Sequence, residues 1–113
     1  MSNTITTHVL DTATGSPAAG MAISLFRLEG EEYVPLVVAQ TNDDGRVPGF
    51  TADIKISAGK YRMIFDTGPY HEKQGVDSFY PEVQVHFAIA NPEQHYHVPL
   101  LISPFGFSTY RGS

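Results

Sequence analysis

Residues 83–102, VQVHFAIANPEQHYHVPLLI, decide the fold of this chain. Positions 83, 85, 87 and 89 are apolar and alternate with Gln, His and Ala, and this period of two is typical of a strand with one buried face. Residues 91–94 are rich in turn-forming side chains. An apolar segment from His95 to Ile102 follows them. The stretch therefore predicts two strands joined by a turn.

Similar patterns recur on both sides of this stretch. They predict further strands at residues 5–10, 21–28, 33–41, 54–57, 61–66 and 107–110. Residues 11–17 and 42–46 have turn chemistry, and Gly45 supplies the positive φ that tight turns often need. About eight short strands with turns between them predict an all-β, two-sheet β-sandwich, and the length fits one domain over residues 1–113.

One short helix is predicted over Pro69 to Gly75. Proline suits the first helical position, Thr67 or Gly68 could cap it, and Gly75 would end it. A helix of about two turns is stable only when packing holds it.

Composition excludes several classes of function. The net charge of -5 argues against nucleic acid, which needs a clustered basic face. The chain has no cysteine, so disulfides and thiolate metal sites are impossible. No apolar run approaches the ~20 residues of a membrane span. Residues 1–7 lack the basic and apolar regions of a secretory signal, so we expect a cytoplasmic protein that does not bind membranes.

Charged residues make up 17% of the chain, below the ~25% that is typical. Few charges leave a surface suited to subunit contacts. A small sandwich with neutral polar faces would have the same composition.

His95 and His97 are the first candidates for chemistry. Residues two apart on a strand share a face, so both imidazoles project the same way, with Pro99 beyond them. They have three interpretations: a solvated pair, a metal site with His8 as a third ligand, or metal-free acid–base chemistry near neutral pH. No carboxylate stands out as a further metal partner.

Arg46 and His8 are weaker candidates when taken alone. Arg46 follows a turn glycine, so it is either a solvent-facing arginine or a planar fork for an anionic or carbonyl-rich substrate. His8 shares a strand face with Thr6 and Leu10, where a lone histidine is more often structural. We expect the two remaining histidines, His71 and His86, to be exposed. Phosphate-loop, dinucleotide, calcium-loop and serine-elbow signatures are absent.

The motifs of this chain resemble those of the transthyretin-related family along essentially its whole length. The matching segments are Thr7–Asp11, Gly15–Ala18, Thr41–Arg46, Tyr61, Phe65–Gly68, Phe79–Val83, His95–Pro104 and Tyr110–Ser113. The ending Tyr-Arg-Gly-Ser is specific to the hydrolases of this family. Transthyretin proper shares the fold but lacks the histidine and arginine set. The departures, such as Tyr80 in place of a second phenylalanine, touch no expected site position.

The resemblance implies a transthyretin-like sandwich that hydrolyses a ring amide of 5-hydroxyisourate in urate degradation, a part of purine catabolism, without a metal or cofactor. It implies that the catalytic residues are His8, Arg46, His97 and Ser113. It also implies that Tyr110, Arg111 and Gly112 shape the substrate site.

Chemistry suggests what each residue would do. One of His8 and His97 would be the base, and the other would orient water or return the proton. Arg46 would clamp the substrate and stabilise the oxyanion, and Ser113 would offer a hydroxyl and a carboxylate.

The resemblance further implies a homotetramer, a dimer of dimers, with sites in a channel between dimers. The alternative function is a transthyretin-like carrier of a small hydrophobic ligand. A carrier needs none of the four catalytic residues.

Overall fold

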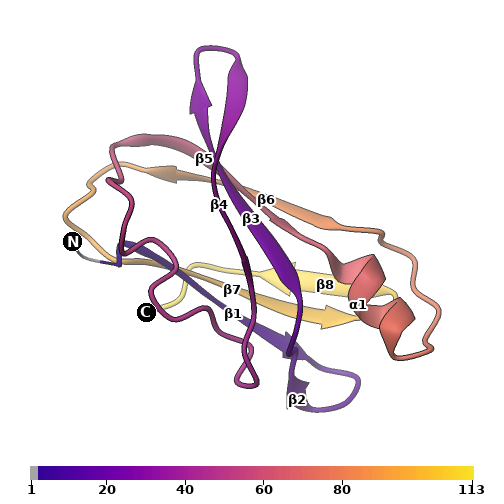
Figure 1. The fold of residues 1–113 in the computed structure, drawn as a ribbon. Coiled ribbons are helices and arrows are strands. Elements are labelled where there is room, and N and C mark those ends of the chain that lie inside the picture. The colour runs from indigo at the N-terminus through magenta and orange to yellow at the C-terminus, as the bar shows by residue number, and fades with distance from the viewer. Residues whose placement is uncertain (1–2) are drawn as a thin grey trace.

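The computed structural model describes residues 3–113, which form two four-stranded sheets and one helix (Figure 1). The elements are β1 (Ile5–Asp11), β2 (Ser16–Pro17), β3 (Ala22–Glu29), β4 (Glu32–Gln40), β5 (Gly59–Phe65), α1 (Thr67–Lys73), β6 (Val83–Ile89), β7 (Tyr96–Ser103) and β8 (Gly106–Thr109). The predicted all-β sandwich of about eight strands with one short helix is confirmed.

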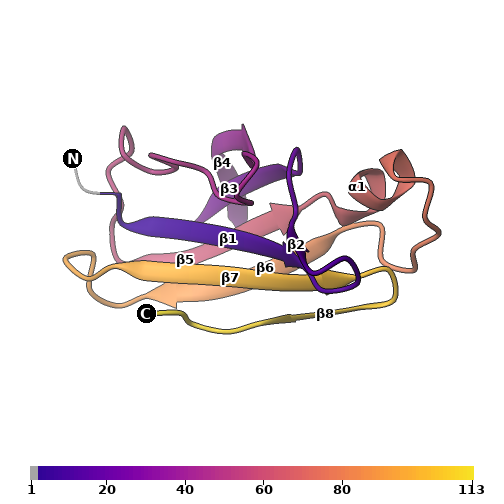
Figure 2. The ribbon, with the colours of Figure 1, turned by 90° about the horizontal axis from the view of Figure 1, so that it is seen from below.

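The two sheets have the strand orders β2-β1-β7-β8 and β4-β3-β5-β6. Within these sheets β1 pairs with β7 in parallel, while every other strand pair is antiparallel. Figure 2 shows β1 and β7 side by side, with the C-terminus near the beginning of β7 and far from α1. The parallel pair therefore brings the first strand and the last third of the chain together.

The core lies between the two sheets and follows the alternation of the strands. In β1 the odd positions 5, 7, 9 and 11 are buried and the even positions are half-buried. Leu25, Tyr61, Met63 and Leu100 are fully buried on the inner faces. Because successive strand residues point to opposite faces, each strand also presents an outer row. His8 and His97 belong to that outer row of the β2-β1-β7-β8 sheet.

The predicted strand at 54–57 is wrong, because this segment is irregular. Ile56 is buried, which explains its apolar pattern. The hydroxyl of Tyr61 donates to the backbone oxygen of Ser57 at 2.7 Å and accepts from its N–H at 3.1 Å. A side chain thus satisfies the groups that a strand partner would otherwise pair. The eighth strand is instead the two-residue β2.

The helix begins and ends two residues earlier than predicted. Thr67 does not cap it, since its hydroxyl donates to the backbone oxygen of Tyr80 at 3.2 Å. Pro69 is the third helical residue, and Gly75 follows the end with φ +70°. The phenol of Tyr70 donates to Asp11 Oδ2 at 2.9 Å, so contacts with β1 help to hold this short helix.

The prediction that His71 is exposed is wrong, because its side chain is buried beneath α1. His86 is exposed as predicted and lies on the other sheet, where its Nδ1 is 3.1 Å from the phenol oxygen of Tyr33. Across residues 3–113, no helix combines the length and the apolar character needed to span a membrane.

Candidate active site

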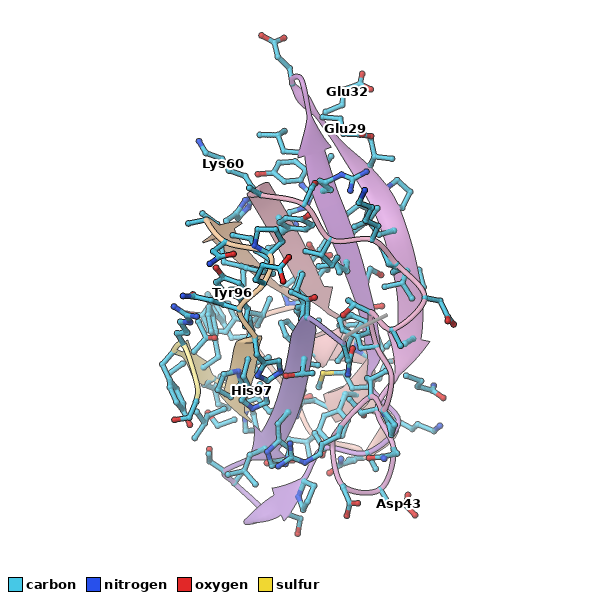
Figure 3. The ribbon with its side chains drawn as sticks, turned by 90° about the vertical axis from the view of Figure 1, so that its left-hand side faces the viewer. Glu29, Glu32, Asp43, Lys60, Tyr96 and His97 are labelled. Atoms are coloured by element: carbon cyan, nitrogen blue, oxygen red, sulfur yellow. The ribbon has the colours of Figure 1, made fainter. Side chains whose placement is uncertain are left out.

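The parallel pairing of β1 and β7 builds the first part of the candidate site. Thr6 is opposite His97 in the register and His8 is opposite Pro99. These residues share the outer face, so His8 and His97 are diagonal neighbours on adjacent strands. Figure 3 shows His97 on β7 close to β1. The structure therefore brings together two of the predicted catalytic residues.

Arg46 reaches the same strand through a tightly bonded loop. The side-chain oxygen of Asn42 accepts from the N–H groups of Asp44 and Arg46, at 2.9 and 3.0 Å. The loop then pairs with β1, as Arg46 forms an antiparallel bridge with His8. The Arg46 side chain is exposed at this position. The arginine is therefore held beside His8 by its backbone, while its side chain is exposed to solvent.

Gly45 makes this docking possible. Its oxygen accepts from Val9 N at 2.8 Å, and its φ is +73°. A Cβ at this position would lie 2.3 Å from the backbone oxygen of Val9. Only glycine fits both the left-handed conformation and the close approach.

The C-terminal segment packs along β7 and ends at His97. Gly112 forms an antiparallel bridge with His97, and its N–H donates to the His97 oxygen at 2.8 Å. The guanidinium of Arg111 lies 4.5 Å from the ring of Tyr96 and donates to the backbone oxygen of His95 at 3.3 Å. Tyr96 faces the core, so Arg111 anchors the segment on the side of β7 away from His97. Tyr110 and Ser113 are exposed.

The pKa of His97 is lowered from its ordinary value of 6.5. Burial is the largest cause, because it disfavours the charged imidazolium. The positive charge of Arg46 lowers it further, followed by His95 and His8. Near neutral pH the ring of His97 is therefore uncharged and able to accept a proton.

Thr6 links His97 of β7 to His95, which lies just before that strand, and its sequence pattern did not mark it as a site residue. Its hydroxyl oxygen lies 2.8 Å from His97 Nδ1 and 2.8 Å from His95 Nε2. The two imidazole rings are nearly parallel, with an interplanar angle of 17° and centroids 6.3 Å apart. The one signal in the sequence was that Thr6 shares a strand face with His8.

No three His, Asp or Glu side chains converge as a metal-binding group anywhere in residues 3–113. His95 and His97 are the two histidines that a metal site would use. Both His97 Nδ1 and His95 Nε2 face the Thr6 hydroxyl. This geometry favours hydrogen bonding between these rings and Thr6 over a shared cation.

On the face that carries His8 and Arg46, the side chain of Arg46 is exposed and that of His8 is half-buried. A cavity of about 250 Å³ reaches His97 between β6 and the C-terminal segment, and neither His8 nor Arg46 lines it. It is lined by Val85, His86, Phe87, Ala88, Tyr96, His97, Val98, Thr109, Tyr110 and Arg111.

The arrangement suits hydrolysis of an amide. Such a reaction needs a base for water, a donor for the developing oxyanion and a proton for the leaving nitrogen. His97 is a neutral imidazole, Arg46 is a permanent cation and His8 is a second imidazole on the same face. The register of β1 and β7 and the bridge between His8 and Arg46 bring the three residues close together.

A model described as the HIUase/Transthyretin family matches residues 5–112. Among curated proteins, 5-hydroxyisourate hydrolase from Mus musculus is 47% identical over 114 residues, covering 99% of this chain and 97% of the mouse protein. Among solved structures, 5-hydroxyisourate hydrolase from Klebsiella pneumoniae has a TM-score of 0.85 and 40% identity. That match covers 96% of this chain and 98% of the Klebsiella chain.

Two further structures show how widely this fold is used. Sea bream transthyretin in complex with thyroxine has a TM-score of 0.91 at 28% identity, with 96% of this chain and 94% of that chain covered. A structure of (S)-allantoin synthase has a TM-score of 0.86 at 41% identity. The match covers 96% of this chain but only 43% of the synthase. A hydrolase and a thyroxine-binding protein thus share one fold, so the site residues must discriminate between the two functions.

Proposed function

This chain belongs to the HIUase/transthyretin family, and from that premise we propose that it is a hydrolase that opens a ring amide of 5-hydroxyisourate. The product is 2-oxo-4-hydroxy-4-carboxy-5-ureidoimidazoline, in urate degradation. The observation that supports this most is the meeting of His8, Arg46 and His97 on one sheet face. A carrier of hydrophobic ligands has no need of that set.

We assign the role of general base to His97. Its lowered pKa keeps the ring unprotonated near neutral pH, and Thr6 occupies its Nδ1, which leaves Nε2 for water. Water loses a proton to Nε2 as its oxygen adds to the ring carbonyl. The ring C–N bond then breaks, and the nitrogen takes a proton back.

Arg46 and His8 complete the proposed chemistry. The guanidinium cannot deprotonate, so Arg46 binds the substrate and stabilises the negative charge on the carbonyl oxygen. His8 lies across the strand pair from His97 and orients the water or protonates the leaving nitrogen. At the end of the C-terminal segment, the hydroxyl of Ser113 adds a hydrogen bond to the substrate or to a histidine. Tyr110, Arg111 and Gly112 of the same segment shape the substrate site.

The proposed assembly is a homotetramer built as a dimer of dimers, with sites enclosed between dimers. The exposure of Arg46 beside the half-buried His8 supports it, as does the low content of charged residues. Exposed aromatic side chains also gather near the β8 edge, where Tyr80 contacts both Phe79 and Phe107 edge to face. Native mass spectrometry at micromolar concentration tests this assembly: a monomer would refute it. The cytoplasmic location stays a prediction.

The function is tested by the decay of freshly made 5-hydroxyisourate, followed by ultraviolet absorbance. We expect purified protein to accelerate the decay in proportion to its concentration. The alternative is a transthyretin-like carrier, and the similarity of the fold to that of sea bream transthyretin supports it. Tight binding of an apolar ligand without acceleration would support that alternative.

A further inference from the structure

We infer that Thr6 and His95 form a proton relay that positions the tautomer of His97 and connects its Nδ1 to solvent. Thr6 and His95 are positioning residues, since they act through His97. The catalytic consequence rests on the proposed hydrolase function. The tautomer itself is a property of the free protein and can be measured without substrate.

The hydroxyl of Thr6 lies between two imidazole rings. Thr6 Oγ1 is 2.8 Å from His97 Nδ1 and 2.8 Å from His95 Nε2. A hydroxyl carries one proton and accepts through its lone pairs. It therefore donates to one of the two ring nitrogens and accepts an N–H from the other. The protonation of the two rings is coupled through this oxygen.

Two arrangements satisfy these bonds, and they give His97 opposite roles. When Thr6 donates to His95 Nε2, it accepts the Nδ1–H of His97, so that His97 Nε2 is bare and acts as a base. When Thr6 donates to His97 Nδ1, the neutral His97 carries its proton on Nε2 and acts as an acid. Rotation of one hydroxyl, together with proton transfer, switches between base and acid.

Strands β1 and β7 hold Thr6 and His97 in place for this switch, and His95 directly precedes β7. Thr6 and His97 are register partners in the parallel pair β1–β7. The branched side chain of threonine restricts its rotamers on a strand. His95 and His97 are two residues apart, and their rings are nearly parallel at 17°. Thr6 is thus placed between the two nitrogens by the register.

The difference in burial between His97 and His95 favours proton transfer from His97 toward His95. His97 is partly buried and close to Arg46, which together lower its pKa, whereas the side chain of His95 is exposed. A positive charge is therefore better solvated on His95 than on His97. Moving the charge outward keeps it away from the guanidinium of Arg46.

The proton transfers balance in both halves of the reaction. As water adds to the carbonyl, its proton goes to His97 Nε2, the Nδ1 proton goes to Thr6 Oγ1, and the hydroxyl proton goes to His95 Nε2. His95 becomes an imidazolium and His97 stays neutral. When the C–N bond breaks, His97 Nε2 gives its proton to the nitrogen, and the same path runs backwards to restore the resting state.

Two substitutions at Thr6 separate the hydroxyl from the shape of the side chain. Thr6→Val keeps the branched shape and removes the hydroxyl, while Thr6→Ser keeps the hydroxyl. Thr12→Val is the matched control, because it removes a threonine hydroxyl that donates to the Ile102 oxygen of β7 at 2.9 Å, far from His97.

The direct test is the tautomer of His97, read from two-bond ¹H–¹⁵N couplings in the uniformly labelled full chain without substrate. We expect Nδ1–H with bare Nε2 in the wild type, in Thr6→Ser and in Thr12→Val. In Thr6→Val the Nε2–H tautomer should gain population. An unchanged tautomer in Thr6→Val would overturn the relay.

Turnover gives a second readout. We expect Thr6→Val to lower kcat about 10²-fold with little change in KM, because the loss falls on proton transfer. Thr6→Ser should restore at least a third of the wild-type kcat. His95→Gln keeps a hydrogen-bonding group but cannot take up a proton, so its kcat should fall and its solvent isotope effect should change. Equal losses in Thr6→Val and Thr6→Ser would contradict the relay.

The measurements distinguish a refuted proton relay from a refuted hydrolase function. A wild-type protein that leaves 5-hydroxyisourate decay unchanged refutes the hydrolase proposal, and the tautomer measurement still decides the hydrogen-bond arrangement. A wild-type protein that turns over, with a Thr6→Val variant of equal kcat, refutes the relay alone.

Discussion

Gly112 lies directly against the imidazole of His97. A Cβ at position 112 would be 2.6 Å from His97 Cδ2, closer than real side chains come. The Gly112 N–H donates to the His97 backbone oxygen at 2.8 Å. The C-terminal segment and the proposed base are therefore one packed unit, and the glycine of the Tyr-Arg-Gly-Ser ending has a steric reason.

Gly112→Ala should strongly reduce turnover while the fold persists. The methyl group must push the segment or the ring of His97 aside, and a displacement of about 1 Å can cost about 10²-fold in rate. Gly106→Ala is the control, since a Cβ there meets Ser103 Oγ at an ordinary 3.6 Å. The check is kcat/KM together with the thermal unfolding midpoint. Equal kcat/KM values for the two variants would show that the packing of Gly112 on His97 is irrelevant to activity.

Gly45→Ala should destabilise the protein and displace Arg46. The residue has φ +73°, and its Cβ would lie 2.3 Å from the Val9 oxygen. Gly15→Ala is a matched control with the same φ but no atom within 4 Å of the new Cβ. The strained conformation costs about 1 kcal/mol in each variant.

Urea denaturation measures the free energy of unfolding of both variants. We expect Gly45→Ala to lose clearly more stability than Gly15→Ala, because it also breaks the contact between the loop and β1. Activity should fall in Gly45→Ala alone. Equal losses of unfolding free energy in the two variants would show that the close approach of Gly45 to Val9 does not stabilise the loop.

Removal of the charge at Arg46 should raise the pKa of His97 toward 6.5. Burial is the first cause of the lowered pKa and would persist, while the repulsion from Arg46 would vanish. An NMR titration of the His97 ring in Arg46→Gln measures this shift. Arg27→Gln is the control, because Arg27 pairs with Glu29 at 3.4 Å on the other sheet. An unchanged pKa of His97 in Arg46→Gln would show that the charge of Arg46 does not act on His97.

The lowered pKa of His97 also sets the sign of two pH effects. The acid limb of kcat/KM for the wild type should lie below pH 6.5, where His97 gains a proton. The free energy of unfolding should also decrease as the pH falls below 6.5. The contribution of His97 is fully present above pH 6.5, and it is lost as the pH falls through the folded-state pKa, because the unfolded chain binds the proton first. An acid limb of kcat/KM that lies above pH 6.5 would argue against His97 as the base.

Chelation should leave the activity intact. His95 Nε2 and His97 Nδ1 both meet the Thr6 hydroxyl, and within residues 3–113 no three ligand side chains converge. Activity after dialysis against a strong chelator is the measurement, with metal content checked by mass spectrometry. A loss that zinc restores would favour the metal interpretation of these histidines.

The local pattern of the chain predicted the strands well, because alternation is a property of single segments. β6 was predicted with the correct residues, and His8 was predicted to share a strand face with Thr6, as it does in β1. The false strand at 54–57 shows the limit. Its apolar residue Ile56 is buried, but Ser57 pairs with the Tyr61 hydroxyl instead of a strand.

What the sequence could not predict depends on contacts between distant segments. Thr6 lies 91 positions before His97, and only the parallel register of β1 and β7 puts its hydroxyl between two histidines. His71 looked like an exposed helix residue, yet α1 buries it against the sheets. The grouping of Arg46 with His8 likewise needed the backbone bridge of its loop, although the family resemblance had already selected both residues.

We propose that His97, with Arg46 and His8, makes this chain a hydrolase of 5-hydroxyisourate. The most direct measurement is the ultraviolet decay of freshly made 5-hydroxyisourate with wild type and His97→Ala at equal concentration, after circular dichroism shows that both are folded. We expect fast decay with the wild type and a rate near the uncatalysed one with His97→Ala. Equal rates for the two proteins, or no acceleration by the wild type, would contradict it.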